Sequence, residues 1–489
     1  MYKYGQTLRS KASTWHLLQK WRAIAPSALA LAFLLTGVII ALPRHQDVHA
    51  DPSSDWPTYM ANIQRSGFNG TETIINATSA PNLKVHWTAK GGGMIFSQPV
   101  AANGMVYWGS WNGYEHATDM SGTPVWQQNL GQTIPNCGAN KALGVISTAA
   151  IASLLINGTI TSVVFVGGGD DHLYALDAST GAIIWSTPLG APSSNTFIWA
   201  SPVIYNDSVY VGTASIGDCP LTPGQFFRID AVTGIIQNTF NLVPSGCVGG
   251  GIWSSPTVDT SDGSIYLTTG TLNSRCPTPE KNALAIVKLS ASDLSFISSW
   301  QIPKAERVKD GDFGTTPTLF QATIDGTVRQ LVGAANKNGI YYAFDRTAIS
   351  NGPVWRAHIA VGGVCPQCGY GSISSSAWDG SLLYVAGGNT TINGNSCKGS
   401  LRALDPATGN FTWEHCLNDG TVLGAVTAVP GVVAVVAGPD LVLVDATSGN
   451  SLFTYNGLTS TSHFYGSPSI SNGVLYVGNK DHKLYALGT

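Results

Sequence analysis

A short phrase recurs along this chain, and it constrains the fold more than any other feature of the sequence. Each copy has the pattern of a strand, an Asp-x-x-Thr-Gly turn and a second strand that ends near an aromatic residue. The Asp side chain can accept hydrogen bonds from the amides of the turn, and Gly supplies the positive φ. The four close copies are YALDASTGAIIW (174–185), FRIDAVTGIIQ (227–237), RALDPATGNFTW (402–413) and VLVDATSGNSLF (442–453); two weaker copies are HATDMSGTPVW (116–126) and YAFDRTAISNGPVW (342–355).

A second predicted hairpin precedes most copies of the phrase. Examples are SPVIYNDSVYVGTA (201–214), SPTVDTSDGSIYLTT (255–269), SSSAWDGSLLYVAGG (374–388) and SPSISNGVLYVGNK (467–480). Two hairpins give four strands over about 40–60 residues, which is the period of a propeller blade. A helical solenoid would need apolar residues at a 3.6-residue period, and the sequence lacks that period.

Counting these units predicts a closed ring of eight blades. Seven complete units run from about 97 to 457, and the eighth ends after its third strand. A lone strand, NLKVHWTAK (82–90), matches the outer strand that the eighth unit lacks. Pairing of 83–89 with 483–487 would leave no open sheet edge. The predicted fold class is therefore all-β: an eight-bladed propeller of four-stranded antiparallel blades, forming one domain over 51–489.

The first 50 residues have the features of a targeting segment. Several Lys and Arg residues precede an apolar run at 23–42, and Val48-His49-Ala50 places small residues at the −3 and −1 positions of a cleavage site. The run is long enough to span a bilayer. The sequence therefore predicts an export signal or an uncleaved N-terminal anchor over 1–50, with the body of the protein outside the cytoplasm.

Composition and cysteine content narrow the function classes. Only 11% of the residues are charged and the net charge is −3, which argues against a nucleic-acid partner. Eight cysteines in an exported chain favour disulfides over free buried thiols. Cys365 and Cys368 can pair only as a tight loop, and we expect the other six to pair largely across neighbouring loops. No Cys-x-x-Cys-His motif occurs, so no covalent haem is indicated.

The order of strands in a blade predicts that the site lies on one face. All eight cysteines fall after second strands or in crossovers between blades, and these loops share a face of the propeller. The loops that hold 249–251, Asp312, Lys337 and Asn273 fall there too. The opposite face is expected to carry only short turns. Long loops on one rim of a rigid scaffold are typical of a binding site.

The repeated phrase resembles the tryptophan-docking repeat of pyrroloquinoline quinone (PQQ) propellers over about 56–489. The segment GGGIWSSPTVD (249–259) is similar to the part of quinoprotein alcohol dehydrogenases in which a Gly-rich turn leads to a Trp stacked under the quinone. This resemblance implies that Trp253 and Gly249, Gly250 and Gly251 bind the cofactor. Trp253 would supply a flat apolar floor.

Two further segments carry the resemblance. KDGDFGTTP (309–317) is similar to the segment with the family's catalytic Asp, most closely in members like polyvinyl alcohol dehydrogenase, which implies Asp312 as the base. AANKNGIYYAFDR (334–346) is similar to the Lys/Arg-Asn-Gly turn, which implies that Lys337 contacts the quinone oxygens. The alternative for Asp312 is that it caps a turn in its loop. The alternative for Lys337 is that it is a solvent-exposed lysine in a hairpin.

The resemblance also implies a Ca²⁺ ion beside the quinone, with Asn273, Asp312 and Asp218 as candidate ligands. Here the chain departs from the family pattern. Thr271 stands where the family places an Asn ligand, and the Glu expected after VYVG (209–212) is missing. Ca²⁺ takes 6–8 oxygen ligands, some of which PQQ itself would supply.

Two functions follow from these patterns. The first is an exported PQQ-dependent dehydrogenase that oxidises an alcohol, possibly secondary or polymeric, and passes electrons to an external acceptor such as a cytochrome. The second is a non-catalytic propeller that acts as an extracytoplasmic binding or assembly scaffold. Only the first requires Trp253, Asp312 and Lys337 to converge on the mouth of the central channel.

Overall fold

The computed structural model describes residues 54–136, 141–190, 194–273, 275–456 and 463–489. The predicted targeting segment over 1–50 and Cys137 lie outside these ranges. Almost all regular structure is strand, and the described helices are single 3₁₀ turns: η1 (Ala80–Asn82), η3 (Lys304–Glu306), η4 (Ile349–Asn351) and η5 (Pro366–Cys368).

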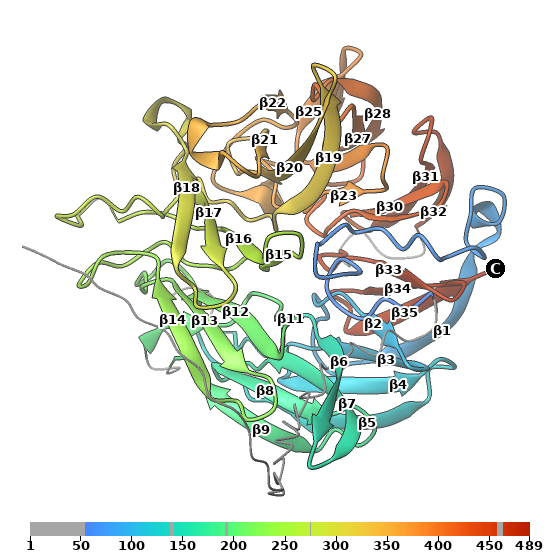
Figure 1. Ribbon diagram of the computed structural model, residues 1–489. Helices are drawn as coiled ribbons and strands as arrows, with labels where there is room; N and C mark the ends of the chain where they lie inside the picture. Colours follow the sequence, from blue (N-terminus) through green and yellow to red (C-terminus); the bar gives the residue numbers. More distant parts are fainter. Residues whose placement is uncertain (1–53, 137–140, 191–193, 274, 457–462) are drawn as a thin grey trace, which may run out of the picture. The chain divides into compact units, whose positions relative to one another are not determined.

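Eight four-stranded antiparallel sheets form the blades of a propeller (Figure 1). Blades 1 to 4 are β2 (Val100–Ala102), β3 (Met105–Gly109), β4 (Tyr114–Asp119), β5 (Pro124–Asn129); β6 (Ala150–Ile156), β7 (Thr159–Gly167), β8 (His172–Asp177), β9 (Ile183–Pro188); β11 (Val203–Tyr205), β12 (Ser208–Ser215), β13 (Gln225–Asp230), β14 (Ile236–Asn241), with β10 (Thr196–Phe197) added to β12; and β15 (Thr257–Asp259), β16 (Ser264–Thr268), β17 (Ala285–Ser290), β18 (Phe296–Gln301).

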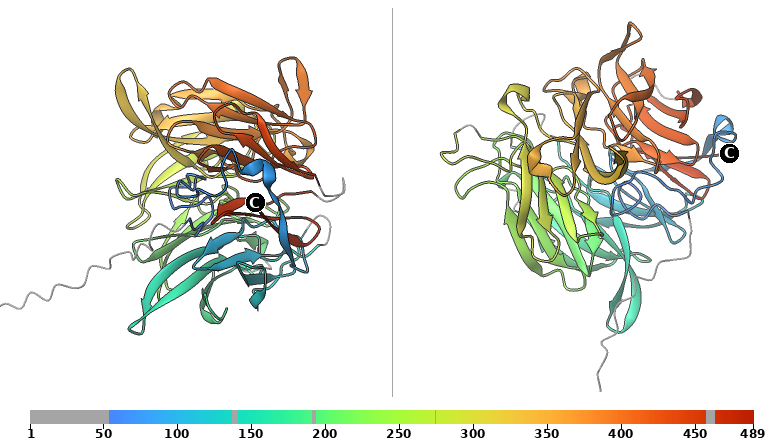
Figure 2. Two further views of the ribbon diagram at one scale, coloured as in Figure 1. Left: turned by 90° about the vertical axis from the view of Figure 1, so that its right-hand side faces the viewer. Right: turned by 45° about the horizontal axis from the view of Figure 1, so that its top comes forward.

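Blades 5 to 8 follow the same order and can be traced in the turned views of Figure 2. They are β19 (Thr318–Ile324), β20 (Thr327–Ala335), β21 (Ile340–Asp345), β22 (Trp355–His358); β23 (Ala377–Trp378), β24 (Leu383–Gly387), β27 (Gly399–Leu404), β28 (Phe411–Leu417), with the ribbon β25 (Thr390–Ile392) and β26 (Asn395–Cys397); β29 (Thr427–Val429), β30 (Val432–Ala437), β31 (Asp440–Asp445), β32 (Ser451–Tyr455); and β33 (Ser469–Ser471), β34 (Val474–Gly478), β35 (Lys483–Gly488), β1 (Lys84–Lys90).

The predicted closure of the ring is confirmed. Strand β1 pairs antiparallel with β35 and completes blade 8, so the two ends of the propeller domain share one sheet. Trp87 on β1 faces Ala486 in the register of the pair. Its indole Nε1 donates to the carbonyl of Met120 in blade 1 over 3.0 Å. The strand that closes blade 8 therefore also joins that blade to the next.

The recurring phrase explains how blades are joined. The Asp caps its turn as expected: Asp177 Oδ1 accepts from the amides of Ser179 and Thr180 at 3.0 and 2.9 Å. The Gly leaves room for a tryptophan of the preceding blade, because a Cβ at Gly181 would overlap the Trp126 ring. The indole of Trp126 donates to the Ala178 carbonyl in the same turn at 2.9 Å.

The same docking recurs around the ring. In each case, an outer-strand indole covers the turn glycine of the next blade and donates to a carbonyl of that turn. The pairs are Trp87 with Gly122, Trp126 with Gly181, Trp185 with Gly234, Trp355 with Gly409 and Trp413 with Gly449. Each indole buries a large apolar surface and satisfies its one polar atom.

A second set of bonds joins the blades around the central channel. At six of the eight junctions, the backbone N–H just before the first strand donates to a Ser or Thr hydroxyl at the same position of the next blade. These bonds run from Gln98 to Thr148, Thr148 to Ser201, Ser201 to Ser255, Ser255 to Thr316, Thr316 to Ser375, and Ala425 to Ser467, at 2.7–3.0 Å. We call the eight equivalent positions (98, 148, 201, 255, 316, 375, 425 and 467) the hydroxyl ring, although Gln98 and Ala425 carry no hydroxyl.

The N-terminal segment over 56–69 runs across the channel, where it is drawn in blue in the middle of the ring (Figure 1). Its backbone bonds to first strands of several blades: Trp56 with Ala101, Pro57 with Ile151, Ile63 with Val258, Ser66 with Trp378, and Gly67 with Ala428. We expected the face of the propeller opposite the site to carry only short turns, and that expectation was incomplete. This segment lacks strand periodicity, and its partners come from blades far apart in the sequence.

Arg65 anchors this segment in the channel. The residue is fully buried, and its guanidinium donates to the carbonyls of Pro256, Pro202 and Tyr59 and to the Thr58 hydroxyl at 2.6–3.0 Å. Burial lowers the pKa of Arg65 to about 9. Among the described residues, no carboxylate pairs with it. Backbone carbonyls of blades 3 and 4 therefore compensate its charge.

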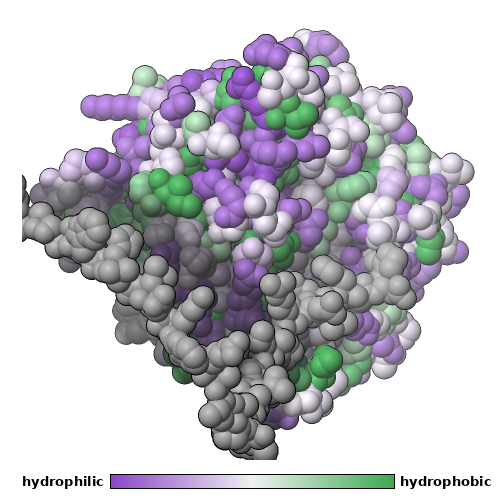
Figure 3. Space-filling view, in the orientation of Figure 1, coloured by the Kyte–Doolittle hydropathy of each residue, from purple (hydrophilic) through white to green (hydrophobic). Residues whose placement is uncertain are grey.

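Polar and apolar residues are interspersed on the face shown in Figure 3 outside the grey atoms. The apolar clusters lie between neighbouring blades, as in the one that joins Tyr107, Leu130, Val145 and Val166 of blades 1 and 2. In the described part of the chain, no helix is both long and apolar enough to cross a membrane.

Arg65 generates the first prediction. Replacing it by Met should lower the free energy of unfolding by about 3 kcal/mol or more, because two or more buried carbonyls lose their donor at about 1–3 kcal/mol each. Denaturant unfolding followed by tryptophan fluorescence measures this loss. Arg275→Met, at an exposed arginine, is the control and should change stability by less than about 0.5 kcal/mol. Equal effects of the two substitutions would contradict the anchoring role.

Glu115 on β4 generates the second prediction. It is fully buried, and neither carboxylate oxygen has a partner among the described residues. Burial raises the pKa of Glu115 well above the usual 4.5. As the pH rises above 4.5, Glu115 releases its proton in the unfolded chain but keeps it in the folded chain, so the wild type loses stability. Glu115→Gln should therefore gain in melting temperature over the wild type from about pH 5 to pH 8 and match it near pH 4. A difference in melting temperature that does not change with pH would refute this.

Candidate functional site

Trp253 lies at the channel end of the crossover into blade 4. It stands two positions before Ser255 of the hydroxyl ring and is half-buried. Its ring reaches toward blade 5, where a Cβ on Gly314 would overlap the far edge of the indole. A glycine at 314 is therefore needed for this position of the ring. The indole Nε1 is buried and has no hydrogen-bond partner among the described residues.

Asp312 and Lys337 come from two loops that hold each other. Asp312 lies in the crossover into blade 5, and Lys337 lies in the turn between β20 and β21. The Lys337 amide donates to the Asp312 carbonyl at 3.1 Å, and Asn336 Nδ2 donates to the Gly311 carbonyl at 2.7 Å. The Lys337 ammonium then pairs with Asp312 Oδ2 at 3.2 Å. Both side chains are 9% exposed, so this ion pair is shielded from solvent.

The structure brings Trp253, Asp312 and Lys337 together. Lys337 Nζ lies 5.3 Å from the centre of the Trp253 ring, within the range of a cation–π contact. Gly270 lies between Trp253 and Asp312, since a Cβ on Gly270 would be 3.5 Å from Trp253 Nε1 and 3.6 Å from Asp312 Cγ. Asp312 does not cap its own loop; its Oδ1 is buried without a partner in the described part of the chain.

Burial and neighbouring charges set the protonation of this group. Burial raises the pKa of Asp312 to about 7; Lys337 opposes the shift, and Asp310 and Asp218 add to it. For Lys337, burial acts to lower the pKa, but Asp312 and Asp310 outweigh it and the pKa is raised. Lys337 therefore stays protonated and supplies the positive charge of the site.

Asp310 is a member of the site that sequence reasoning missed. Its Oδ2 pairs with Lys337 Nζ at 3.1 Å, and its Oδ1 is buried without a partner among the described residues. It stands two positions before Asp312 in KDGDFG, so the spacing was visible, although nothing in the pattern gave both carboxylates one lysine. Asp218 lies nearby, and part of the residue is exposed to solvent. Partial desolvation of its carboxylate, together with the charge of Asp310, raises the pKa of Asp218.

The other candidate residues have local partners. The amide of Gly250 donates to the Thr271 carbonyl at 2.8 Å, and the Gly251 carbonyl accepts from Gly270 at 2.8 Å, so the glycine run packs against the loop after β16. A Cβ on Gly249 would lie 2.6 Å from the Thr271 carbonyl oxygen. Asn273 Oδ1 accepts from the Arg275 amide at 3.1 Å, which caps its own turn.

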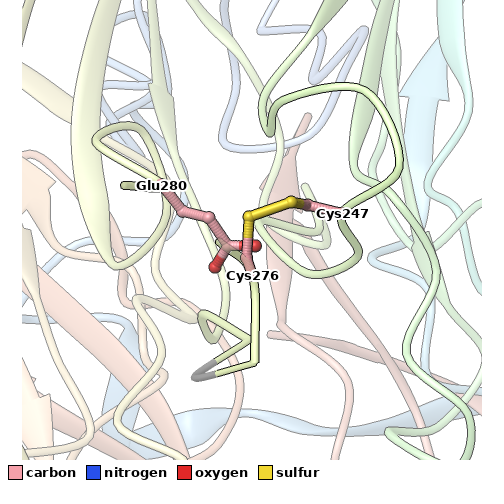
Figure 4. A group of neighbouring side chains, drawn as sticks. All are labelled: Cys247, Cys276 and Glu280. Atoms are coloured by element: carbon pink, nitrogen blue, oxygen red, sulfur yellow. A yellow bond between two sulfur atoms is a disulfide. The ribbon is translucent and has the colours of Figure 1, made fainter. Parts of the chain in front are cut away.

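A disulfide fixes the loop that carries Asn273. Cys247 pairs with Cys276, and Glu280 lies beside them, with its Oε2 accepting from the Asn273 amide at 2.6 Å (Figure 4). Two cysteines and a carboxylate at this distance could hold a metal ion. The two sulfurs are bonded to each other, however, which leaves no thiolate for a metal. The cluster therefore joins the loops on either side of the glycine run.

Two further disulfides lie within one part of the ring. Cys365 pairs with Cys368 in the tight loop that the sequence predicts, and Cys397 pairs with Cys416 within blade 6. The loop of the first pair packs against the turn that carries Lys337, because the Gly363 amide donates to the Lys337 carbonyl at 2.9 Å.

A family model described as "Outer membrane protein assembly factor BamB" matches residues 112–275 and 337–489, which is more than half of the chain. The chain belongs to the PQQ_2 repeat family. The family membership confirms the PQQ-type propeller that the repeated phrase predicts.

Within and beyond the PQQ_2 family, three similarities are informative. The polyvinylalcohol dehydrogenase of Sphingopyxis sp. (strain 113P3) is 24% identical over 70% of this chain and 56% of its own length. The structure of quinohemoprotein alcohol dehydrogenase from Comamonas testosteroni superposes with a TM-score of 0.70 at 18% identity, over 90% of this chain and 81% of that chain. BamB from Moraxella catarrhalis gives a TM-score of 0.52 at 15% identity, over 83% and 98% of the two chains.

The chain spans less than two thirds of the length of the curated relatives that it matches. The superpositions, at less than 25% identity, establish the propeller fold.

The disulfides generate the third prediction. Three disulfides form among the described residues, so the denatured, non-reduced protein should expose at most two thiols. Thiol titration in denaturant gives the count, and reduction beforehand should raise it to eight. A count above two without reductant would show that at least one of these pairs does not form.

Proposed function

We propose that this protein is an exported PQQ-dependent dehydrogenase that oxidises an alcohol and passes the electrons to an external acceptor. The observation that carries the proposal is the convergence of an aromatic ring, a buried carboxylate with a free oxygen and a buried ammonium at one point, from blades 4 and 5. The names of the curated relatives, polyvinylalcohol dehydrogenase and quinohemoprotein alcohol dehydrogenase, support the same reaction class.

The residues present suit a planar quinone. Trp253 is half-buried and supplies a flat aromatic surface, and its Nε1 lacks a partner among the described residues. Lys337 lies near the level that a ring stacked on Trp253 would occupy. Asp310, Asp312 and Asp218 offer carboxylate oxygens for a divalent ion, which favours such ligands. Asn273, whose side chain caps its own turn, would have to turn outward to join them.

PQQ, when bound, would supply the two-electron acceptor for the carbinol hydrogen. The protein contributes a base and a cation. Asp312 Oδ1 would accept the hydroxyl proton as the carbinol C–H bond breaks and the C=O bond forms, which requires an oxygen within about 3 Å of that proton. Lys337 would hold Asp312 in position through Oδ2 and leave Oδ1 for the substrate. Its charge would also stabilise negative charge that develops nearby.

The alternative function, a non-catalytic assembly scaffold, is supported by the description of the family model and by the fold of BamB. A scaffold gains nothing from burying a lysine between two carboxylates, Asp310 and Asp312, since buried ionic groups cost desolvation energy. We therefore favour the dehydrogenase. The predicted export and the membrane tether through 23–42 belong to this proposal and concern residues outside the described ranges.

Substitution of Asp312 tests the catalytic role and is the fourth prediction. Asp312→Asn should lower dye-linked alcohol oxidation about 10²–10⁴-fold, the usual contribution of a positioned base. PQQ binding, followed by quinone absorbance or quenching of tryptophan fluorescence, should stay within a few fold of the wild type. The exposed Asp325→Asn is the matched control and should leave both unchanged.

Trp253→Ala separates binding from chemistry in the same assays. It should weaken PQQ binding about tenfold or more through the loss of stacking and of buried area. Asp312→Asn that retains full activity would refute the role of Asp312. A wild-type protein that binds no PQQ with Ca²⁺ present, and reduces no dye with any alcohol, would favour the scaffold function.

A further inference from the structure

The channel mouth carries one equivalent residue from every blade. These residues stand two positions before each member of the hydroxyl ring, as Trp253 stands before Ser255. In the order of blades 1 to 8 they are Phe96, Ile146, Trp199, Trp253, Gly314, Ile373, Leu423 and Tyr465. All eight are half-buried, and seven have apolar or aromatic side chains. Partly exposed large side chains gathered at one place are typical of a ligand site.

Five residues from consecutive blades form a continuous surface, which we call the aromatic arc: Tyr465, Phe96, Trp111, Ile146 and Trp199. Phe96 packs edge-on against Tyr465 and Trp111, with ring centres 5.0 and 4.7 Å apart. Trp111, Ile146 and Trp199 then pack on one buried cluster of Leu143, Phe197 and Ile216. The arc thus runs without interruption from blade 8 through blades 1 and 2 to blade 3.

The position of the arc relates it to the candidate catalytic group. Asp312 and Lys337 belong to blade 5, which is the fourth blade from blade 1 in either direction around a ring of eight. Phe96 and Trp111 of blade 1 therefore lie across the channel mouth from them. Asp310, Asp312 and Lys337 occupy the sector of blade 5, and the middle of the arc lies opposite them, while Asp218 follows β12 in blade 3, beside the Trp199 end of the arc. A molecule whose hydroxyl meets Asp312 would extend its remaining atoms toward the arc.

We propose that the aromatic arc binds the hydrocarbon part of the alcohol substrate. The inference rests on the proposed dehydrogenase function and adds the substrate class: alcohols with an alkyl chain or an aromatic ring of several carbons. None of the five side chains is charged, and only Tyr465 and the two indoles carry a polar atom. Recognition of a sugar needs several hydrogen-bonding partners placed around its hydroxyls. Methanol is too small to touch both Asp312 and the arc.

The test uses the full-length exported protein loaded with PQQ and Ca²⁺ and a series of primary alcohols from methanol to 1-octanol, with benzyl alcohol. The wild-type kcat/KM should rise about fourfold for each added methylene until the chain covers the arc, as expected for burial of a CH₂ group. Phe96→Ala should lower kcat/KM for 1-hexanol and benzyl alcohol at least tenfold while changing that for ethanol less than threefold. The larger part of the loss should appear in KM.

A matched control and a binding measurement keep the outcomes distinct. Leu423→Ala, at the equivalent position of blade 7 outside the arc, should leave the chain-length series unchanged, and both variants should bind PQQ with wild-type affinity. A flat series in an active wild type, or an equal loss for ethanol and 1-hexanol in Phe96→Ala, would overturn the arc and leave the dehydrogenase intact. An arc that binds PQQ itself would appear as weakened PQQ binding in Phe96→Ala and would also overturn the inference. A wild type inactive on every alcohol would overturn the proposed function.

Discussion

The contact on which the ring depends is a tryptophan that docks on the turn of the next blade. The indole of Trp126 covers Gly181 and donates its only proton to the Ala178 carbonyl, and the contact recurs at four other junctions. A closed ring has no spare junction, since one opened interface exposes the apolar faces of two neighbouring sheets. The hydroxyl ring adds a second set of bonds on the inner side. Together they make neighbouring blades rigid enough to position loops that belong to different blades.

The candidate site draws its geometry from that rigidity. Trp253 reaches from blade 4 over Gly314 of blade 5, and Lys337 joins two loops of blade 5 through one ammonium. The disulfide loop at Cys365–Cys368 and the Cys247–Cys276 bridge support the two sides of this group. The Asp310–Asp312–Lys337 group and the middle of the aromatic arc, at Phe96 and Trp111, lie on opposite sides of one mouth. That separation suits a reaction at one end of an apolar molecule.

Much of this could be predicted from the sequence, for identifiable reasons. The repeat gave eight blades and the closing strand, because both depend on local strand and turn patterns. Trp253, Asp312 and Lys337 could be picked out because they stand in short motifs that resemble those of quinoprotein alcohol dehydrogenases. Asp310 was missed, because only the folded loops show two carboxylates on Lys337. Arg65 was missed too, because its partners at Pro202 and Pro256 are more than 130 residues away in the chain.

The pairing of β1 with β35 has a consequence for how the chain acquires its structure. The strand made first in the propeller domain finds its partner only in the last residues, Lys483–Gly488. During synthesis, β1 must therefore wait unpaired while seven blades assemble behind it. Its partner at the C-terminus is also the part most easily lost to truncation. Removal of a few terminal residues would leave a protein with all seven complete blades but an open ring, prone to association through its free edges.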